Sequence, residues 1–163
     1  MDLERFKPTD EATRQAVRSE LGISSDEIVV GFVGRLVKEK GVPELIEAVE
    51  QLGSPFRLLL IGSADPEKTD AVPQALLDQA EQRGVILTGH REDTEHFYAA
   101  MDVFCLLSHR EGFPRAAMEA AASGLPVVAT DIRVPAGGGR RRDRRLGPRA
   151  RSSEAGCGHP AGG

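Results

Sequence analysis

Short apolar runs alternate with longer amphipathic segments along residues 21–133. The runs are rich in Val, Ile and Leu at most positions, which is typical of parallel strands that are buried on both faces. The predicted strands are Ile28–Val33, Arg57–Ile61, Val85–Thr88, Val103–Leu107 and Pro126–Ala129. The predicted helices are Asp10–Leu21, Val42–Leu52, Pro73–Gln82, Asp93–Ala100 and Pro114–Ser123. This alternation predicts an α/β fold, a parallel sheet of about five strands with helices on both faces.

Proline marks the starts of three predicted helices. Pro43, Pro73 and Pro114 stand where a missing backbone N–H costs nothing, and a glycine follows the end of each helix. Thr9 or Asp10 is expected to cap the first helix. The helix boundaries are therefore well defined by the sequence.

The apolar pattern ends at residue 134. Residues 134–163 hold eight Gly and seven Arg, with Val134 and Leu146 as the sizeable aliphatic residues. A segment of this composition cannot bury a core, so we expect it to be disordered. Glycine, arginine, alanine and proline are what GC-rich codons encode, which leads to the hypothesis that this tail is read out of frame.

Length and composition indicate one domain, or one half of a two-domain enzyme. The chain has 163 residues, and its seven aromatic residues include no Trp, so a mostly aliphatic core is expected. Residues 1–133 carry 14 Lys and Arg against 23 Asp and Glu. The net negative charge of residues 1–133 is expected to repel nucleic acid. No apolar stretch could cross a bilayer and the N-terminus is too charged for a secretory signal, which predicts a cytoplasmic protein.

The first candidate loop leaves the first predicted strand. It runs from Gly34 through Arg35 to Lys40 and Gly41, a glycine turn with cations beside a helix start. Parallel sheets bind ligands at the carboxyl ends of their strands, and free N–H groups with a guanidinium suit a phosphate there. A plain turn with solvated charges explains the same residues. The loop matches neither the dinucleotide fingerprint nor a P-loop.

The second candidate loop leads into an alanine-rich helix and carries two carboxylates. Alanine at most positions of residues 116–122 predicts a helix packed closely all round, in which Glu119 needs a partner. Glu111 precedes the helix, where the free N–H groups of Gly112 and Phe113 can face a ligand. Purely structural roles for both carboxylates remain open.

The third candidate loop and the remaining reactive side chains give weaker signals. His90 and Arg91 could stack on a planar ligand or simply form a polar loop tip. His96 and His109 have no second ligand at metal spacing, so no metal site is predicted. Cys105 lies in an apolar run and is interpreted as a core thiol. No Ser-His-Asp or Cys-His set stands out, although distant residues could form one.

Together these motifs resemble the C-terminal, donor-binding half of a retaining glycosyltransferase of family 4, a Rossmann-like domain of the two-domain GT-B fold. The resemblance covers residues 3–133. The motifs follow the family's order and are Phe32-Val33-Gly34-Arg35-Leu36 with Lys40-Gly41, Ala100-Met101-Asp102-Val103-Phe104, Glu111-Gly112-Phe113-Pro114, Met118-Glu119-Ala120 and Gly124-Leu125-Pro126-Val127-Val128-Ala129-Thr130-Asp131. Glu111 and Glu119 are similar to the two ends of the family's E-x7-E motif.

The resemblance implies a role for each matched residue. Arg35 and Lys40 would bind the diphosphate of a nucleotide sugar, Glu111 would contact the transferred sugar, and Glu119 would hydrogen-bond the ribose. Cations and a helix N-terminus would then stabilise the leaving group, so no metal and no other cofactor is expected. The implied site has Glu111 as its catalytic residue, and its donor-binding residues are Gly34, Arg35, Lys40, His90, Arg91, Gly112, Phe113 and Glu119.

The implied partners are a nucleotide sugar and a saccharide or lipid-linked acceptor. The motifs are similar to those of enzymes that build bacterial capsule, exopolysaccharide or lipid-linked glycans. Peripheral membrane association and self-association through an exposed sheet edge are further expectations, whereas nucleic acid is not expected. The family's N-terminal domain and its segment after Arg133 have no counterpart in this chain. We therefore expect a fragment that binds the donor without transferring sugar.

On this interpretation residues 1–20 hold a linker remnant and the first helix, residues 21–133 the nucleotide-sugar-binding domain, and residues 134–163 the tail. Two other classes of protein remain open. The first is a noncatalytic Rossmann-like interaction module whose basic tail contacts nucleic acid or an acidic partner. The second is half of a dinucleotide-dependent oxidoreductase, which would need G-x-G-x-x-G after the first strand and an acidic residue at the end of the second.

Overall fold

Five strands form one sheet in which every neighbouring pair runs parallel, in the order β3-β2-β1-β4-β5. The computed structural model describes residues 4–65 and 67–131, and the structural statements here concern those residues. The strands are β1 (Ile28–Val33), β2 (Phe56–Ile61), β3 (Ile86–Leu87), β4 (Val103–Leu106) and β5 (Val127–Ala129). After β3 the chain crosses from one side of β1 to the other, so the strand order reverses between β1 and β4.

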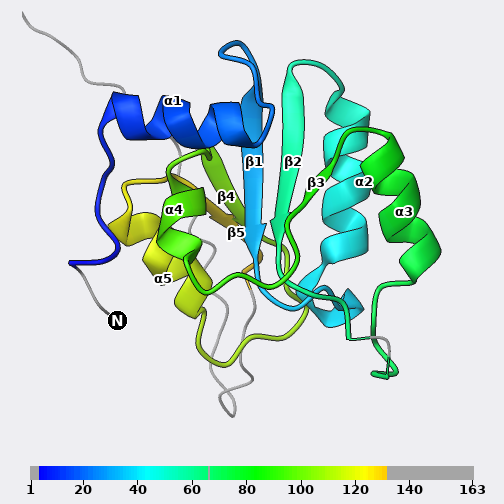
Figure 1. Cartoon of the computed structure of the whole chain (residues 1–163). Coiled ribbons are helices and arrows are strands. Elements are labelled where there is room, and N and C mark those ends of the chain that lie inside the picture. The colour runs from blue at the N-terminus through cyan, green and yellow to red at the C-terminus, as the bar shows by residue number, and fades with distance from the viewer. Residues whose placement is uncertain (1–3, 66, 132–163) are drawn as a thin grey trace, which may run out of the picture. The chain divides into compact units, whose positions relative to one another are not determined.

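Helices lie on both faces of the sheet, with α2 and α3 on one side and α1, α4 and α5 on the other (Figure 1). They are α1 (Glu11–Glu20), α2 (Val42–Leu52), α3 (Gln74–Gln82), α4 (Thr94–Tyr98) and α5 (Arg115–Ala122), with a short 3-10 helix η1 (Lys38–Lys40) before α2. The predicted α/β fold is confirmed. Most boundaries agree within two residues, but η1 was not predicted and α4 is three residues shorter than expected.

The N-terminal cap of α1 is Asp10, one of its two predicted candidates. Its side chain accepts a hydrogen bond of 2.9 Å from the backbone N–H of Thr13. That bond satisfies one of the N–H groups that an α-helix leaves unpaired at its first turn. The local sequence therefore determines where α1 begins.

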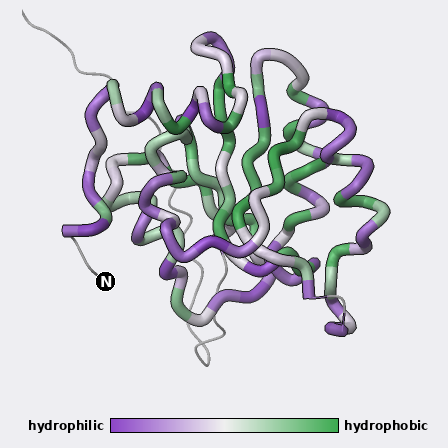
Figure 2. The backbone as a smooth tube through the Cα atoms, viewed as in Figure 1, coloured by the Kyte–Doolittle hydropathy of each residue, from purple (hydrophilic) through white to green (hydrophobic). Residues whose placement is uncertain are grey.

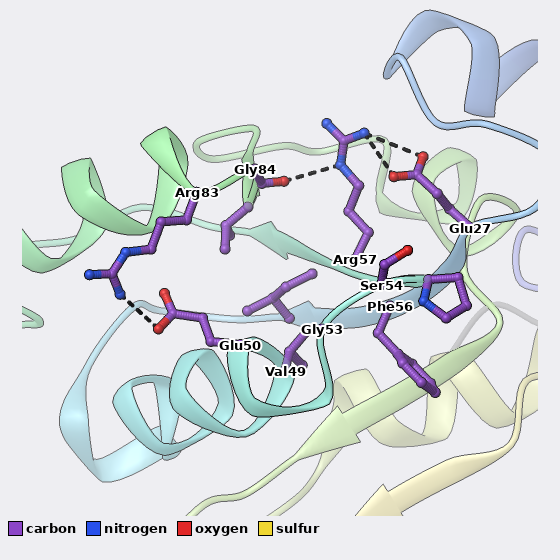
Figure 3. Close-up of a pocket in the computed structure, with 12 residues that line it drawn as sticks. Glu27, Val49, Glu50, Gly53, Ser54, Phe56, Arg57, Arg83 and Gly84 are labelled. Carbon is purple, nitrogen blue, oxygen red and sulfur yellow. Dashed lines mark hydrogen bonds and ion pairs between the residues drawn. The ribbon is translucent and has the colours of Figure 1, made fainter.

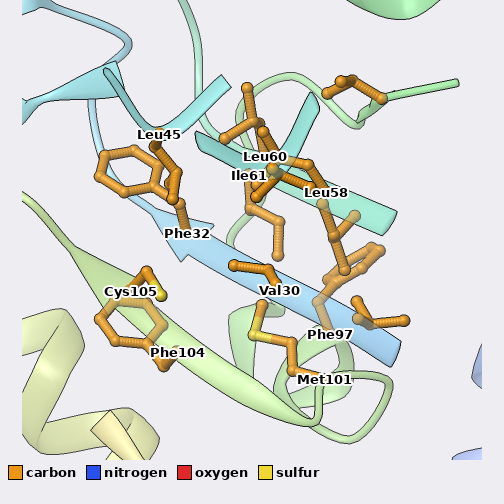
Figure 4. Close-up of a cluster of buried hydrophobic side chains, with 14 of the residues drawn as sticks. Val30, Phe32, Leu45, Leu58, Leu60, Ile61, Phe97, Met101, Phe104 and Cys105 are labelled. Carbon is orange, nitrogen blue, oxygen red and sulfur yellow. The ribbon is translucent and has the colours of Figure 1, made fainter. Parts of the chain in front are cut away.

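The core is mainly aliphatic, as predicted. Apolar residues are concentrated in the strands, whereas hydrophilic residues follow the outer helices and loops (Figure 2). Figure 4 shows side chains of β1, β2 and β4 packed together with Phe97 and Met101. Cys105 is buried, as predicted, and burial raises the pKa of its thiol.

A buried arginine joins α1 to the amino ends of the strands. Arg18 is 5% exposed and donates hydrogen bonds to Asp102 Oδ2 and to the carbonyl oxygens of Ala100, Ser24 and Glu27. Asp102 Oδ2 also accepts the backbone N–H of Val29 at 2.7 Å. One ion pair therefore connects α1, β1 and the start of β4, and it holds the first helix against the sheet.

The edge strand β5 is exposed, which agrees with the expected exposed sheet edge but not with the burial on both faces that its apolar composition alone indicates. Val127 is 37% exposed and Val128 is 50% exposed, although these residues point to opposite faces of the sheet. The reason is position, because β5 pairs with β4 on one side and has no strand beyond it within the described residues. The predictions made for residues 134–163 fall outside the described part of the chain and stay predictions.

Candidate functional site

Two loops meet at the carboxyl ends of β1 and β4, where the strand order reverses. In open α/β sheets the crevice at this reversal is the usual ligand site. The backbone N–H of His109 donates to the carbonyl oxygen of Glu39 at 2.8 Å. Gly41, with φ of +69°, lies so close that a Cβ atom there would be 2.2 Å from the Leu107 carbonyl oxygen. Glycine at this position therefore allows the two loops to touch.

A lysine and a glutamate link these loops. Lys40 Nζ lies 2.6 Å from Glu111 Oε2, and the two side chains are 19% and 16% exposed. Ser108, which is 1% exposed, donates its hydroxyl to the same oxygen at 3.2 Å. Thr130 in turn donates its hydroxyl to the Ser108 carbonyl oxygen at 2.6 Å. The structure therefore brings together two predicted site residues, and it holds the carboxylate with a cation and a hydroxyl.

The second predicted carboxylate lies on α5 beside a small cavity. Glu119 is 8% exposed, and its Oε2 accepts the Tyr98 hydroxyl at 3.2 Å. Its Oε1 lies 3.5 Å from the guanidinium of Arg115, which is largely exposed. Phe113, Arg115, Met118 and Glu119 line a cavity of about 110 Å³. A carboxylate at the wall of a partly apolar cavity can accept hydrogen bonds from a hydroxyl-bearing ligand.

The prediction that α5 is packed closely all round is wrong. Glu119 and Ala120 are buried, but Met118 is 38% exposed and Ala121 is exposed. One side of the helix packs on the sheet and the other borders the surface. Alanine permits close packing but does not require it, so composition alone could not indicate how many sides of the helix are covered.

Three glycines bring the loops after β1, β2 and β3 together. A Cβ atom on Gly62 would lie 1.8 Å from the carbonyl oxygen of Gly34, and the Gly62 N–H donates to the carbonyl of Gly89 at 2.8 Å. The predicted residues His90 and Arg91 follow directly. His90 is exposed.

Arg91 is occupied within its own loop. Its guanidinium donates two hydrogen bonds to Asp93, at 2.9 and 2.8 Å, and lies 4.7 Å from the centre of the Phe97 ring. This hydrogen-bonded guanidinium lowers the pKa of Asp93 to about 2. No contact in the described structure joins His90 or Arg91 to Lys40 or Glu111, so their ligand-binding role stays a prediction.

The remaining predicted groups are exposed. Arg35 is exposed, and its guanidinium forms no hydrogen bond or ion pair with any described residue. Phe113 is 65% exposed, and the N–H groups of Gly112 and Phe113 donate to no atom within residues 4–65 and 67–131. The N–H groups of Gly112 and Phe113 are therefore available to an anion that approaches the start of α5.

A larger cavity lies at the opposite, amino-terminal end of the strands. It has a volume of about 530 Å³, with apolar side chains such as Val49 between two ion pairs (Figure 3). Arg57 pairs with Glu27 at 3.2 Å, and Arg83 pairs with Glu50 at 2.8 Å. These four charged side chains already satisfy one another, so this cavity has less to offer a charged ligand than the strand-end loops.

The described residues show neither a metal centre nor a membrane-spanning helix. No cluster of three or more His, Cys, Asp or Glu side chains in this part of the chain could hold a metal ion. No helix in the same part is long and apolar enough to cross a bilayer.

A parallel α/β sheet with charged loops at its strand reversal defines a Rossmann-like class of ligand-binding domain. The chain belongs to the family of glycosyl transferases group 1, whose family model matches residues 13–137. It is 38% identical over 112 residues to the capsular polysaccharide biosynthesis glycosyltransferase CapM of Staphylococcus aureus, a match that covers 66% of this chain and 29% of CapM. The chain spans about a third of the length of the curated relatives it matches.

Solved structures agree with this assignment. The chain is 31% identical to HepE of Anabaena in complex with UDP-glucose, with a TM-score of 0.70 over 79% of this chain and 36% of HepE. It is 29% identical to the C-terminal domain of the group 1 protein LpcC from Francisella tularensis, with a TM-score of 0.66 over 79% of this chain and 69% of that domain. The resemblance to a C-terminal glycosyltransferase domain is therefore confirmed.

Sequence reasoning missed two hydroxyl groups of this site. They belong to Ser108 and Tyr98, and the sequence motifs single out neither residue. Ser108 lies three residues before Glu111, so a local signal existed. Tyr98 lies 21 residues before Glu119 and contacts it only because α4 packs beside α5, so no spacing could have revealed it.

Proposed function

We propose that this chain binds the nucleotide-sugar donor of a retaining hexosyltransferase that acts in bacterial polysaccharide or glycan biosynthesis. The observation that carries the proposal is the Lys40–Glu111 pair at the strand reversal, in a chain that belongs to the glycosyltransferase family. The relative HepE, which was solved with UDP-glucose, supports a uridine nucleotide sugar as the ligand to test first. Sugar transfer to a saccharide or lipid-linked acceptor is proposed for the whole enzyme, because the chain spans about a third of its relatives.

The diphosphate is assigned to the cations and free amides of the two loops. Lys40 already holds an anionic oxygen at 2.6 Å, so its ammonium can donate to a phosphate oxygen in the same place. Arg35 and the N–H groups of Gly112 and Phe113 have no competing partner among the described residues. Positive charge fixed at the leaving diphosphate stabilises the charge that develops there during transfer. We propose that these groups, rather than a divalent cation, supply that stabilisation.

The two carboxylates are assigned to the sugar and to the ribose. Glu111 shares Lys40 with the proposed diphosphate position, so it lies beside the sugar that the diphosphate carries. Glu119 lies on α5 at the small cavity, where its Oε1 can accept hydrogen bonds from the ribose hydroxyls. The charged acceptor would make each of these bonds stronger than one between neutral groups.

The test is titration calorimetry of the chain with uridine diphosphate. Replacing Arg35→Ala or Lys40→Ala removes a charge-assisted contact and should weaken binding roughly tenfold or more. Lys38→Ala is the matched control, because Lys38 is an exposed cation of η1 whose side chain forms no hydrogen bond or ion pair with a described residue and has no assigned role. Equal affinities in the wild type and all three variants would refute the assignment. Binding that survives EDTA unchanged would support the assignment of the charge to side chains.

A further inference from the structure

Glu119 is held from behind by a tyrosine on another helix. Tyr98 lies at the end of α4 and is 1% exposed. Its hydroxyl lies 3.2 Å from Glu119 Oε2 and 3.1 Å from the Ala116 carbonyl oxygen, so both acceptors are on α5. The ring itself is packed edge-on against Phe6 and Phe104, with centroid distances of 5.9 and 6.0 Å. The ring contacts hold the side chain in the core, and the two acceptors on α5 set where the hydroxyl points.

The two oxygens of Glu119 therefore have different surroundings. Oε2 faces the protein interior and the Tyr98 hydroxyl, in a hydrogen bond between buried groups. Oε1 faces the guanidinium of Arg115 at 3.5 Å, on the side of the small cavity. A carboxylate with one oxygen anchored can rotate little about its last bond, so the free oxygen keeps a defined position.

We propose that Tyr98 is a positioning residue that holds Glu119 so that Oε1 faces the ribose hydroxyls and thereby sets the preference for ribonucleotides. This inference rests on the proposed function, because it concerns the same donor site. Because Tyr98 lies on α4, the proposal gives α4 a role in ligand specificity in addition to that of Glu119 on α5. Removing the phenol hydroxyl would release Oε2 and leave the Glu119 side chain free to turn away from the ligand.

The protonation state of Tyr98 is consistent with this role. Burial, and then the adjacent Glu119 carboxylate, raise the pKa of Tyr98 above its usual value. The phenol therefore stays protonated near neutral pH and remains a hydrogen-bond donor. A neutral donor holds the carboxylate without cancelling its charge, which leaves Glu119 able to accept from a hydroxyl-bearing ligand.

The first experiment measures ribose selectivity rather than affinity alone. The readout is the dissociation constant of 2′,3′-dideoxyuridine diphosphate divided by that of uridine diphosphate. Tyr98→Phe should reduce this ratio roughly threefold to tenfold, the value of one modest hydrogen bond. Its affinity for inorganic pyrophosphate should stay unchanged, because pyrophosphate has no ribose. Glu119→Ala should reduce the ratio at least as much as Tyr98→Phe.

Phe6→Leu is the matched control for packing. It loosens the aromatic contact with the Tyr98 ring but keeps the hydroxyl, so it should leave the ratio unchanged. A Tyr98→Phe ratio equal to that of the wild type, with Glu119→Ala still reducing it, would overturn the inference and leave the proposed function standing. Unchanged ratios in both variants would overturn the ribose contact itself. A Phe6→Leu ratio as low as that of Tyr98→Phe would show that packing, and not the hydroxyl, is responsible.

A second measurement needs no Tyr98 variant, so it decides the question even if Tyr98→Phe does not fold. Tyr98 is the single tyrosine of the chain, which has no tryptophan, so tyrosine emission reports this one residue. A carboxylate acceptor quenches tyrosine emission, so Glu119→Gln should increase the signal. Uridine diphosphate should change the wild-type emission, whereas pyrophosphate at saturation should not. Emission that is insensitive to both Glu119→Gln and uridine diphosphate would overturn the inference.

Discussion

The Lys40–Glu111 pair predicts that removing a proposed catalytic carboxylate strengthens the binding of a simple anion. In the free chain Lys40 Nζ lies 2.6 Å from Glu111 Oε2, and both side chains are less than one fifth exposed. A diphosphate that binds Lys40 must share this cation with a carboxylate of its own sign. Glu111→Gln keeps the shape of the side chain and removes the competing charge, so inorganic pyrophosphate should bind more tightly.

The magnitude follows from the geometry of the pair. Two unit charges about 4 Å apart attract by about 4 kcal/mol at an effective dielectric constant of about 20. Desolvation and screening reduce the net value of a partly exposed pair to about 1 to 2 kcal/mol. Glu111→Gln should therefore increase pyrophosphate affinity about fivefold to thirtyfold, and the gain should shrink as salt is added.

The assay is calorimetric titration with pyrophosphate at low and at high salt. Glu44→Gln is the matched control, because Glu44 lies in the first turn of α2, four residues from Lys40, and forms an exposed pair with His109. Glu44→Gln makes the same change in net charge without touching Lys40, so its effect on pyrophosphate affinity should be small. The gain from Glu111→Gln should also disappear in a Lys40→Met background. Pyrophosphate affinity that falls or does not change in Glu111→Gln would refute the reasoning.

Three further predictions concern stability and association. Arg18→Met should lower the free energy of unfolding in urea by about 2 to 4 kcal/mol, because it leaves buried acceptors unsatisfied. Arg83→Met is the control, since it breaks an exposed pair and should cost about 1 kcal/mol or less. Equal costs in the two variants would contradict the role of Arg18. The stability that the Arg91–Asp93 pair contributes is fully present above the pKa of an unfolded aspartate, about 3.9, and is lost as the pH falls through about 2. The difference in unfolding free energy between the wild type and Asp93→Asn should shrink over that range, and a constant difference would disprove the assignment. Val128→Lys on the edge strand should weaken concentration-dependent self-association in sedimentation experiments, and unchanged association would contradict a contact through this edge.

The fold was predictable because local signals and tertiary packing agree along most of the chain. Pro43 and Gly53 bracket α2, and Asp10 caps α1, so these helix ends needed no tertiary information. The apolar run of β1 is buried where it pairs between β2 and β4, as its composition requires. The exposed strand β5 has the same composition but a different neighbourhood. An apolar run does not indicate whether it is central or at an edge, and that information lies in the topology.

The candidate site was predictable only in its separate parts. The motifs identified Lys40 and Glu111 individually, but their contact depends on Gly41 lying against the Leu107 carbonyl. Gly62 similarly fits against the carbonyl of Gly34, and both contacts join residues that are distant in the sequence. A glycine in a sequence shows that a close approach is allowed without indicating what approaches. Contacts of this kind therefore emerge only from the folded chain.

Glu111 and Glu119 are held by different groups, so their proposed contributions to binding should differ. Glu111 is held by the cation that is also assigned to the diphosphate, so donor binding must change its electrostatic surroundings. Glu119 is held by a neutral phenol and only distantly by an exposed guanidinium, and neither of these groups is assigned to the diphosphate. Substitution of Glu111 should therefore change the affinity for pyrophosphate, whereas substitution of Glu119 should change the preference among nucleosides. Because the groups that hold the two carboxylates have no member in common, the two effects should be additive in the double variant. Strong coupling between them would show that the diphosphate and ribose positions overlap, and it would require a different placement of the donor on these loops.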